Sequence, residues 1–147
     1  MLILSAFARG QNSSLAIGVR HLPNDVGGNA MVEVTFTNTS KHDLFFPCSD
    51  VSRLKIFVNK DDGTPAEDTE EGAKLKEQQL NPRGSKSVCV GNDMTPGQSL
   101  TFKKNIANFY KVSTPGTYHL KMEMDVPGDS TAKSPQIDLV IKDGGVN

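Results

Sequence analysis

Three histidines are the side chains in this sequence best suited to acid–base chemistry near neutral pH. His21, His42 and His119 lie far apart along the chain. A nucleophilic site would need a serine or cysteine held beside one of them. His119 alternates with apolar residues that should face inward, and His42 lies in a polar, turn-rich stretch. We therefore expect three surface histidines, no catalytic residue, and a protein that is not an enzyme.

Paired carboxylates are the second feature that could support catalysis or bind a metal. Asp61-Asp62 and Glu70-Glu71 lie in polar stretches, whereas a general acid needs a desolvated site that raises its pKa. Asp61-Asp62-Gly63 offers oxygen ligands for calcium, but it lacks the further spaced oxygen donors of a calcium loop. Three histidines and two cysteines are too few for a convincing multi-ligand zinc site. We expect no metal and no cofactor.

The charge balance of the chain limits its partners. The 147 residues contain 16 Lys and Arg against 17 Asp and Glu, a formal net charge of -1. Nucleic-acid binding needs a clustered basic excess, and a polybasic membrane anchor needs the same. No stretch approaches the roughly 20 apolar residues of a membrane span. We expect one domain, no nucleic-acid partner and no membrane span, with an unknown protein or cell-surface partner.

The N-terminal segment indicates the cellular compartment. Residues 2–8 are apolar and end in Ala6-Phe7-Ala8, a small-x-small pattern like that of a signal-peptidase site. Polar residues follow from Arg9. The alternative is an ordinary first strand or a frayed tail. We predict a signal-peptide remnant or disordered N-terminus over 1–13, a domain over 14–142 and a tail over 143–147, in a secreted or periplasmic protein.

Two cysteines are consistent with export. Cys48 and Cys89 enclose about 40 residues, and a disulfide closing such a loop would stabilise the fold by roughly 4 kcal/mol on the chain-entropy model. The alternative is two separate buried thiols, which are common for free cysteine. A possible disulfide between them is therefore a prediction with an open alternative.

Apolar residues recur with a period of two along most of the chain. Such alternation is typical of half-buried antiparallel strands. The clear runs cover residues 15–19, 32–36, 54–58, 100–102, 118–124 and 137–141, and weaker runs cover 43–48 and 85–90. Pro96-Gly97 and Pro115-Gly116 each precede a strand, as in type II turns. The pattern predicts an all-β antiparallel sandwich of about seven to eight strands.

Residues 66–83 interrupt this alternation. The stretch is strongly polar and has no apolar stripe, although Glu70 and Lys74 are spaced as a helical ion pair. We predict a long solvated loop with at most one helical turn or an edge strand. Residues 105–111 carry apolar side chains at helix-like spacing and predict one turn that crosses between sheets.

A tyrosine after a tight turn is the most specific local signal. Pro115-Gly116 predicts the turn, and Tyr118 then begins an alternating strand. In immunoglobulin-type sandwiches a tyrosine in this place donates a hydrogen bond back to the chain and fixes a sheet-to-sheet corner. A strand that merely begins with tyrosine is the alternative. We predict that Pro115, Gly116 and Tyr118 form a structural corner.

The order of these strands and turns resembles a known group of domains. Leu54-Lys55-Ile56-Phe57-Val58 with Asp62-Gly63, the segment from Met94 to Leu100, and Pro115-Gly116-Thr117-Tyr118 carry the likeness. The chain resembles immunoglobulin-like domains of uncharacterised secreted bacterial proteins. It is also similar to BsuPI-type proteinase inhibitor domains and to the N-terminal domain of deuterolysin-type metalloproteases. It lacks the tryptophan common after the Asp-Gly turn in the inhibitors, and it lacks the zinc-binding His-Glu-x-x-His of the proteases.

These observations favour a non-enzymatic, exported interaction or accessory module. The resemblance also implies two alternatives, a proteinase inhibitor and an accessory domain or pro-domain of a secreted hydrolase. Residues 66–83 form the only long candidate for an interaction loop. Lys74, Lys76 and Arg83 within it would be the exposed basic residues of a trypsin-type inhibitory site.

Overall fold

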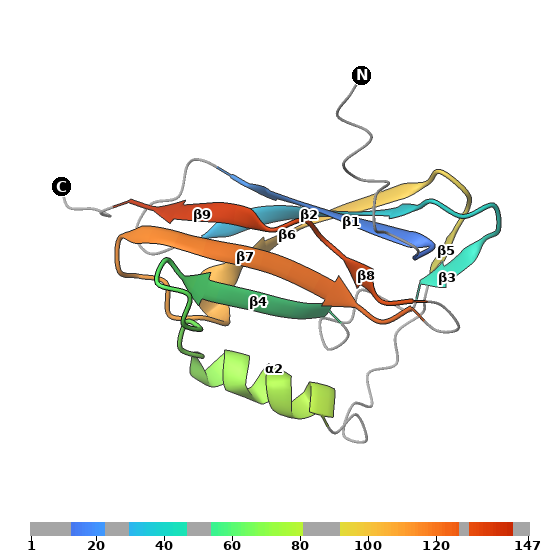
Figure 1. The fold of residues 1–147 in the computed structure, drawn as a ribbon. Coiled ribbons are helices and arrows are strands. Elements are labelled where there is room, and N and C mark those ends of the chain that lie inside the picture. Colours follow the sequence, from blue (N-terminus) through green and yellow to red (C-terminus); the bar gives the residue numbers. More distant parts are fainter. Residues whose placement is uncertain (1–12, 23–29, 47–53, 81–91, 127–129, 143–147) are drawn as a thin grey trace.

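The computed structural model describes residues 13–22, 30–46, 54–80, 92–126 and 130–142. Within these ranges the chain forms nine strands, one α-helix and one short 3-10 helix. Figure 1 shows that the longer strands form two layers and that the α-helix lies beside one of them.

The first sheet has the strand order β1-β2-β6, with both pairs antiparallel. Its strands are β1 (Leu15–His21), β2 (Met31–Asn38) and β6 (Ser99–Asn105). Alternate side chains of β1 and β2 are buried, as the period of two predicts. On this inner face the rings of Phe36 and Phe102 pack with their centroids 5.2 Å apart.

The second sheet is formed around β7 (Gly116–Met124), its longest strand. β4 (Leu54–Lys60) pairs with one edge of β7. β8 (Ala132–Lys133) and β9 (Ile137–Ile141) pair with its other edge, one after the other. All of these pairs are antiparallel, so the alternating residues of each strand share one inner and one outer face.

The hydrophobic core lies between the two sheets. Each fully buried large apolar side chain contributes roughly 1.5–3 kcal/mol to folding. The core includes Leu15, Ile17, Val32, Val34 and Phe36 from the first sheet, and Leu54, Ile56, Val58, Leu120, Met122, Leu139 and Ile141 from the second. The prediction of an all-β antiparallel sandwich is therefore confirmed.

A buried asparagine joins the first sheet to a small third pair of strands. β3 (Leu44–Phe46) and β5 (Asn92–Met94) form this two-stranded sheet. The side-chain amide of Asn38 is fully buried and donates to the His42 carbonyl at 2.7 Å and to the Met94 carbonyl at 2.8 Å. The remainder of the predicted strand 43–48, and the whole of the predicted strand 85–90, lie outside the described residues.

Tyr118 makes the hydrogen bond that a sheet-to-sheet corner requires. Its side chain is buried, and its hydroxyl donates to the Thr114 carbonyl at 2.8 Å. Gly116, two residues before Tyr118, has a φ of 150°, a backbone conformation that residues other than glycine rarely adopt. Gly97, after Pro96, has a φ of 83°, which fits the second central position of a type II turn.

The prediction of a solvated loop over 66–83 is wrong, because residues Glu70–Leu80 form the helix α2. Thr69 caps its first turn: the Thr69 hydroxyl accepts from the Gly72 amide at 3.0 Å. Glu70 and Glu71 add favourable negative charge beside the exposed amides of that turn. The helix was hard to foresee because it turns a glycine, rather than an apolar stripe, toward the rest of the protein.

The predicted turn over 105–111 is confirmed as the 3-10 helix η3 (Ile106–Asn108). The Asn105 side chain caps it by accepting from the Ala107 amide at 3.1 Å. Ile106 is fully buried, and the turn lies between β6 of the first sheet and β7 of the second, so the chain crosses between the sheets here. No helix among the described residues is long and apolar enough to cross a membrane.

Candidate functional site

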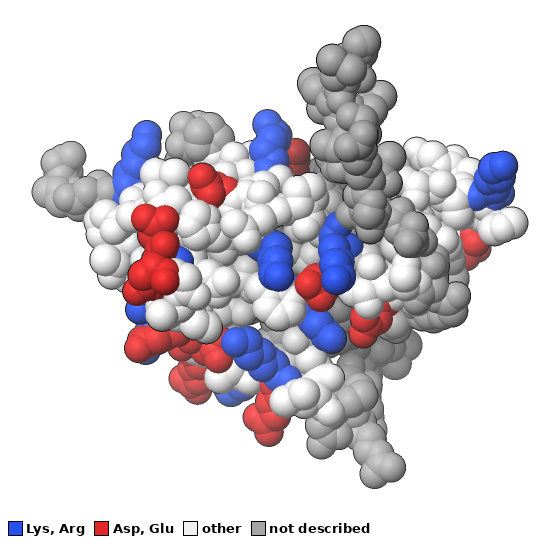
Figure 2. Space-filling view, in the orientation of Figure 1, with Lys and Arg blue, Asp and Glu red and all other residues white. Residues whose placement is uncertain are grey.

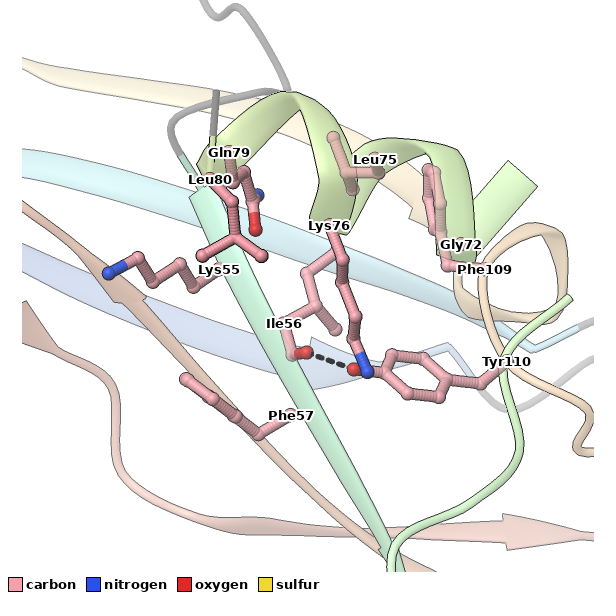
Figure 3. Close-up of a pocket in the computed structure, with 10 residues that line it drawn as sticks. All are labelled: Lys55, Ile56, Phe57, Gly72, Leu75, Lys76, Gln79, Leu80, Phe109 and Tyr110. Carbon is pink, nitrogen blue, oxygen red and sulfur yellow. Dashed lines mark hydrogen bonds between the residues drawn. The ribbon is translucent and has the colours of Figure 1, made fainter. Parts of the chain in front are cut away.

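A groove of about 340 Å³ separates α2 from the edge of β4 and is the best candidate for a functional site. Figure 3 shows Lys76, Gln79 and Leu80 pointing from the helix toward the strand. This α2–β4 groove is lined by Lys55, Ile56, Phe57, Gly72, Leu75, Lys76, Gln79, Leu80, Phe109 and Tyr110. Its size lies at the lower end of the range for small-molecule sites, and its lining is mainly apolar.

The floor of the groove is an edge strand whose outward carbonyls already have donors. Gln79 Nε2 donates to the Leu54 carbonyl at 3.0 Å, and the Tyr110 hydroxyl donates to the Ile56 carbonyl (Figure 3). The next outward carbonyl, that of Val58, accepts from the amide of Ala66 at 2.9 Å. Three successive outward carbonyls of β4 are therefore satisfied from within the chain.

The first turn of α2 is fastened to the segment after η3. The Thr69 amide donates to the Phe109 carbonyl at 3.0 Å, and the Thr69 hydroxyl donates to the Asn108 carbonyl at 2.6 Å. Gly72 then passes so close that a Cβ atom there would lie 1.9 Å from the Phe109 carbonyl oxygen. Only glycine permits this approach, which holds the first turn of α2 against the Phe109 backbone at that end of the groove.

Lys76 and Tyr110 form the polar end of the groove. Lys76 Nζ lies 2.8 Å from Asp68 Oδ1 and 5.1 Å from the centre of the Tyr110 ring. The hydrogen bond to Asp68 raises the pKa of Lys76, so its ammonium stays charged. Burial raises the pKa of Tyr110, which keeps its phenol neutral and able to donate to β4.

The other end of the groove is open and is lined by apolar side chains together with Lys55. Leu80 is 87% exposed and Phe57 is 37% exposed, which is unusual for large apolar side chains. Lys121 Nζ lies 5.5 Å from the centre of the Phe57 ring, and Lys55 Nζ lies 3.7 Å from Asp125 Oδ2. An apolar group of a ligand could therefore cover this end and gain from the area removed from water.

On the face of the molecule shown in Figure 2, the distribution of charged side chains does not favour one class of charged polymer as a partner. Basic and acidic side chains are interspersed there. Surface pairs such as Arg20 with Glu33, whose charged atoms are 2.9 Å apart, illustrate this mixing. This face offers no continuous basic surface of the kind that nucleic-acid backbones require.

The basic residues predicted to form an interaction loop lie in different places in the structure. Lys76 turns into the groove, whereas Lys74 is exposed and lies 3.6 Å from Glu70, one helical turn back. Arg83 lies outside the described residues, as do both members of the predicted pair Cys48 and Cys89. Pro115, Gly116 and Tyr118, the residues of the predicted corner, do not line the groove.

Sequence reasoning missed Tyr110, Gln79 and Phe57 as groove residues. Their only sequence signals are the adjacent aromatic residues Phe109-Tyr110 and an apolar residue, Phe57, on the outward side of an alternating strand. Both signals are common in structural roles. The groove depends on where α2 packs, and the periodicity of apolar residues in the sequence does not indicate that position.

His119 is a surface residue with two carboxylate partners. Its Nε2 lies 3.1 Å from Asp61 Oδ1, and its Nδ1 lies 3.0 Å from Asp138 Oδ1. His42 is exposed in the turn before β3. Across the described ranges, no group of three or more histidine, cysteine or acidic side chains is arranged to hold a metal ion.

Comparison with known proteins adds no family to this description. No protein-family model and no curated protein sequence matches the chain. Its class therefore rests on its architecture: an antiparallel β-sandwich with a helix-flanked groove at one edge strand.

Proposed function

We propose that this chain is a non-enzymatic binding module and that the α2–β4 groove receives an apolar group of its partner. The observation that carries the proposal is the combination of a 340 Å³ apolar groove with the exposed Leu80 and Phe57 at its open end. Exposed large apolar side chains beside a concave surface favour an interaction site.

The state of the polar groups in the groove supports binding rather than catalysis. The Tyr110 hydroxyl donates to a backbone carbonyl, Lys76 bonds to Asp68, and the Gln79 amide donates to β4. A general base must be close to the proton it removes and free to accept it. These three groups instead hold the walls of the groove together.

The helical form of residues 70–80 favours this proposal over the inhibitor alternative. An inhibitory loop that binds in the active site of a protease in the manner of a substrate must present an extended backbone. Lys74 and Lys76 lie within α2, where the backbone is committed to helical hydrogen bonds. A role as an accessory domain of a larger hydrolase is compatible with a binding groove and would make the hydrolase, or its substrate, the partner.

A neutral apolar probe tests the proposed site. We would add 1-octanol stepwise to nitrogen-15-labelled protein and follow the amide resonances of the protein by nuclear magnetic resonance. Saturable shifts should be confined to α2, β4 and the Phe109–Tyr110 segment. Leu80→Asp should weaken binding, whereas Val140→Asp, a change at an apolar residue that is 48% exposed on β9, should not. Shifts elsewhere, or equal effects of the two variants, would refute the site.

We further propose that the protein is exported, on the basis of residues 2–8 and their small-x-small ending. Expression with the natural upstream sequence should place mature protein outside the cytoplasm. N-terminal sequencing of that material should begin near Arg9. Full-length protein retained in the cytoplasm would contradict export and would leave the binding proposal to its own test.

A further inference from the structure

His119 lies where three segments of the second sheet meet. In the antiparallel register it stands opposite Asn59 of β4 on one side and Asp138 of β9 on the other. Asp61, in the turn that follows β4, reaches the same ring from beyond the end of the strand. About a quarter of the His119 side chain is exposed, so both solvent and these partners contact the ring.

Both ring nitrogens of His119 face carboxylate oxygens, and this arrangement determines how many protons the ring must carry to make both hydrogen bonds. An ionised carboxylate accepts hydrogen bonds and has none to donate. A neutral imidazole has only one N–H, so it can satisfy only one of the two aspartates. Both contacts, at 3.1 Å and 3.0 Å, are hydrogen bonds only when both nitrogens carry a proton.

We propose that His119 is a pH-sensitive staple that, in its protonated form, holds the turn after β4 to strand β9 across β7. Deprotonation removes one N–H and so releases either Asp61 or Asp138. The staple joins segments that are not neighbours in the sheet, because β4 and β9 lie on opposite edges of β7.

The other charged groups near the ring do not oppose this assignment. Lys121, the next outward residue of β7, lies over the Phe57 ring. Asp62, beside Asp61, is occupied by Thr64, whose amide and hydroxyl both donate to its Oδ1. The hydrogen bonds to Asp61 and then Asp138 are the main causes that raise the pKa of His119.

The direction of the pH effect follows from linkage. The folded state holds the proton more tightly than the unfolded chain, whose histidine pKa is about 6.5. The staple therefore contributes its full stabilisation below that unfolded pKa. The contribution is lost as the pH rises through the raised folded pKa.

Nuclear magnetic resonance of the imidazole tests the staple directly. We expect nitrogen-15 shifts of His119 to report two protonated nitrogens at acidic pH and a pKa above that of the same residue in urea-unfolded protein. Asp61→Asn and Asp138→Asn should each lower this pKa, and Asp62→Asn, the matched control in the same turn, should not. Amide exchange in the turn should accelerate as His119 deprotonates, beyond the rise found in His119→Asn.

Three results would overturn the proposal. The first is a His119 pKa equal to that of the unfolded chain. The second is a pKa that responds to Asp62→Asn as much as to Asp61→Asn, because that would indicate general charge rather than the two contacts. The third is turn exchange with the same pH dependence in the wild type and in His119→Asn. The aspartates are exposed and His119 is about a quarter exposed, so the fold should survive each of these changes.

Discussion

Replacing Gly72 with alanine should destabilise the protein, although the same change usually stabilises a helix. In an exposed helix interior, alanine is favoured over glycine by about 1 kcal/mol. Gly72 is instead buried, and a Cβ atom there would lie 1.9 Å from the Phe109 carbonyl oxygen and 2.8 Å from its carbon. Backbone atoms cannot rotate away as a flexible side chain would.

The size of the effect follows from the movement that the new methyl group demands. Ordinary contact at such a Cβ begins at 3.4 Å, so α2 must move outward by about 1.5 Å. Overpacking of this kind costs about 1–3 kcal/mol. After the gain in helix propensity of about 1 kcal/mol is subtracted, we expect a net loss of about 0–2 kcal/mol in the free energy of unfolding. If α2 instead detaches from the rest of the protein, the loss of stability equals the free energy of helix docking.

Equilibrium urea unfolding measures the loss, and Gly18→Ala is the matched control. The nearest atom to a Cβ at Gly18 is the Thr35 carbonyl oxygen at 4.0 Å, so this glycine in β1 has room. The control should be neutral or stabilising by up to about 1 kcal/mol. Faster amide exchange confined to α2 would identify local undocking. A Gly72→Ala protein that is more stable by about 1 kcal/mol would show that α2 does not approach Phe109.

Three further predictions concern the stability of the fold and the two cysteines. Tyr118→Phe should cost roughly 1 kcal/mol in urea unfolding, because it removes a partly buried hydrogen bond; unchanged stability would refute the corner. Asn38→Ala should cost about 2–3 kcal/mol by the same measurement, because it leaves two carbonyls without their donor. If Cys48 and Cys89 pair, intact protein from an oxidising compartment will be 2 Da lighter than its reduced form, with no alkylation before reduction.

The sandwich was predictable because alternation is a direct consequence of burying one face of a strand. In β7 the buried residues Tyr118, Leu120, Met122 and Met124 alternate with exposed or half-buried ones over the whole strand. The strand begins at Gly116, directly after Pro115. Local signals of this kind need no knowledge of the partner strand.

The groove was not predictable, because its contacts join residues that are distant in sequence. The Tyr110 hydroxyl reaches the carbonyl of Ile56, 54 positions earlier, and Gln79 reaches Leu54. A polar helix that docks through Gly72 has no apolar stripe to reveal it. His119 presents the same problem, since its partners depend on strand register and on where the turn after β4 closes.

The satisfied carbonyls of β4 have a consequence for how this protein behaves at high concentration. An exposed edge strand with free backbone groups is a template on which another chain can add, and it leads to aggregation. Here Gln79, Tyr110 and Ala66 occupy the acceptors that an incoming strand would need. Two of those donors are single side-chain groups. Gln79→Ala would therefore free one of these carbonyls and threaten solubility, whereas loss of Tyr110 would also remove a buried core side chain.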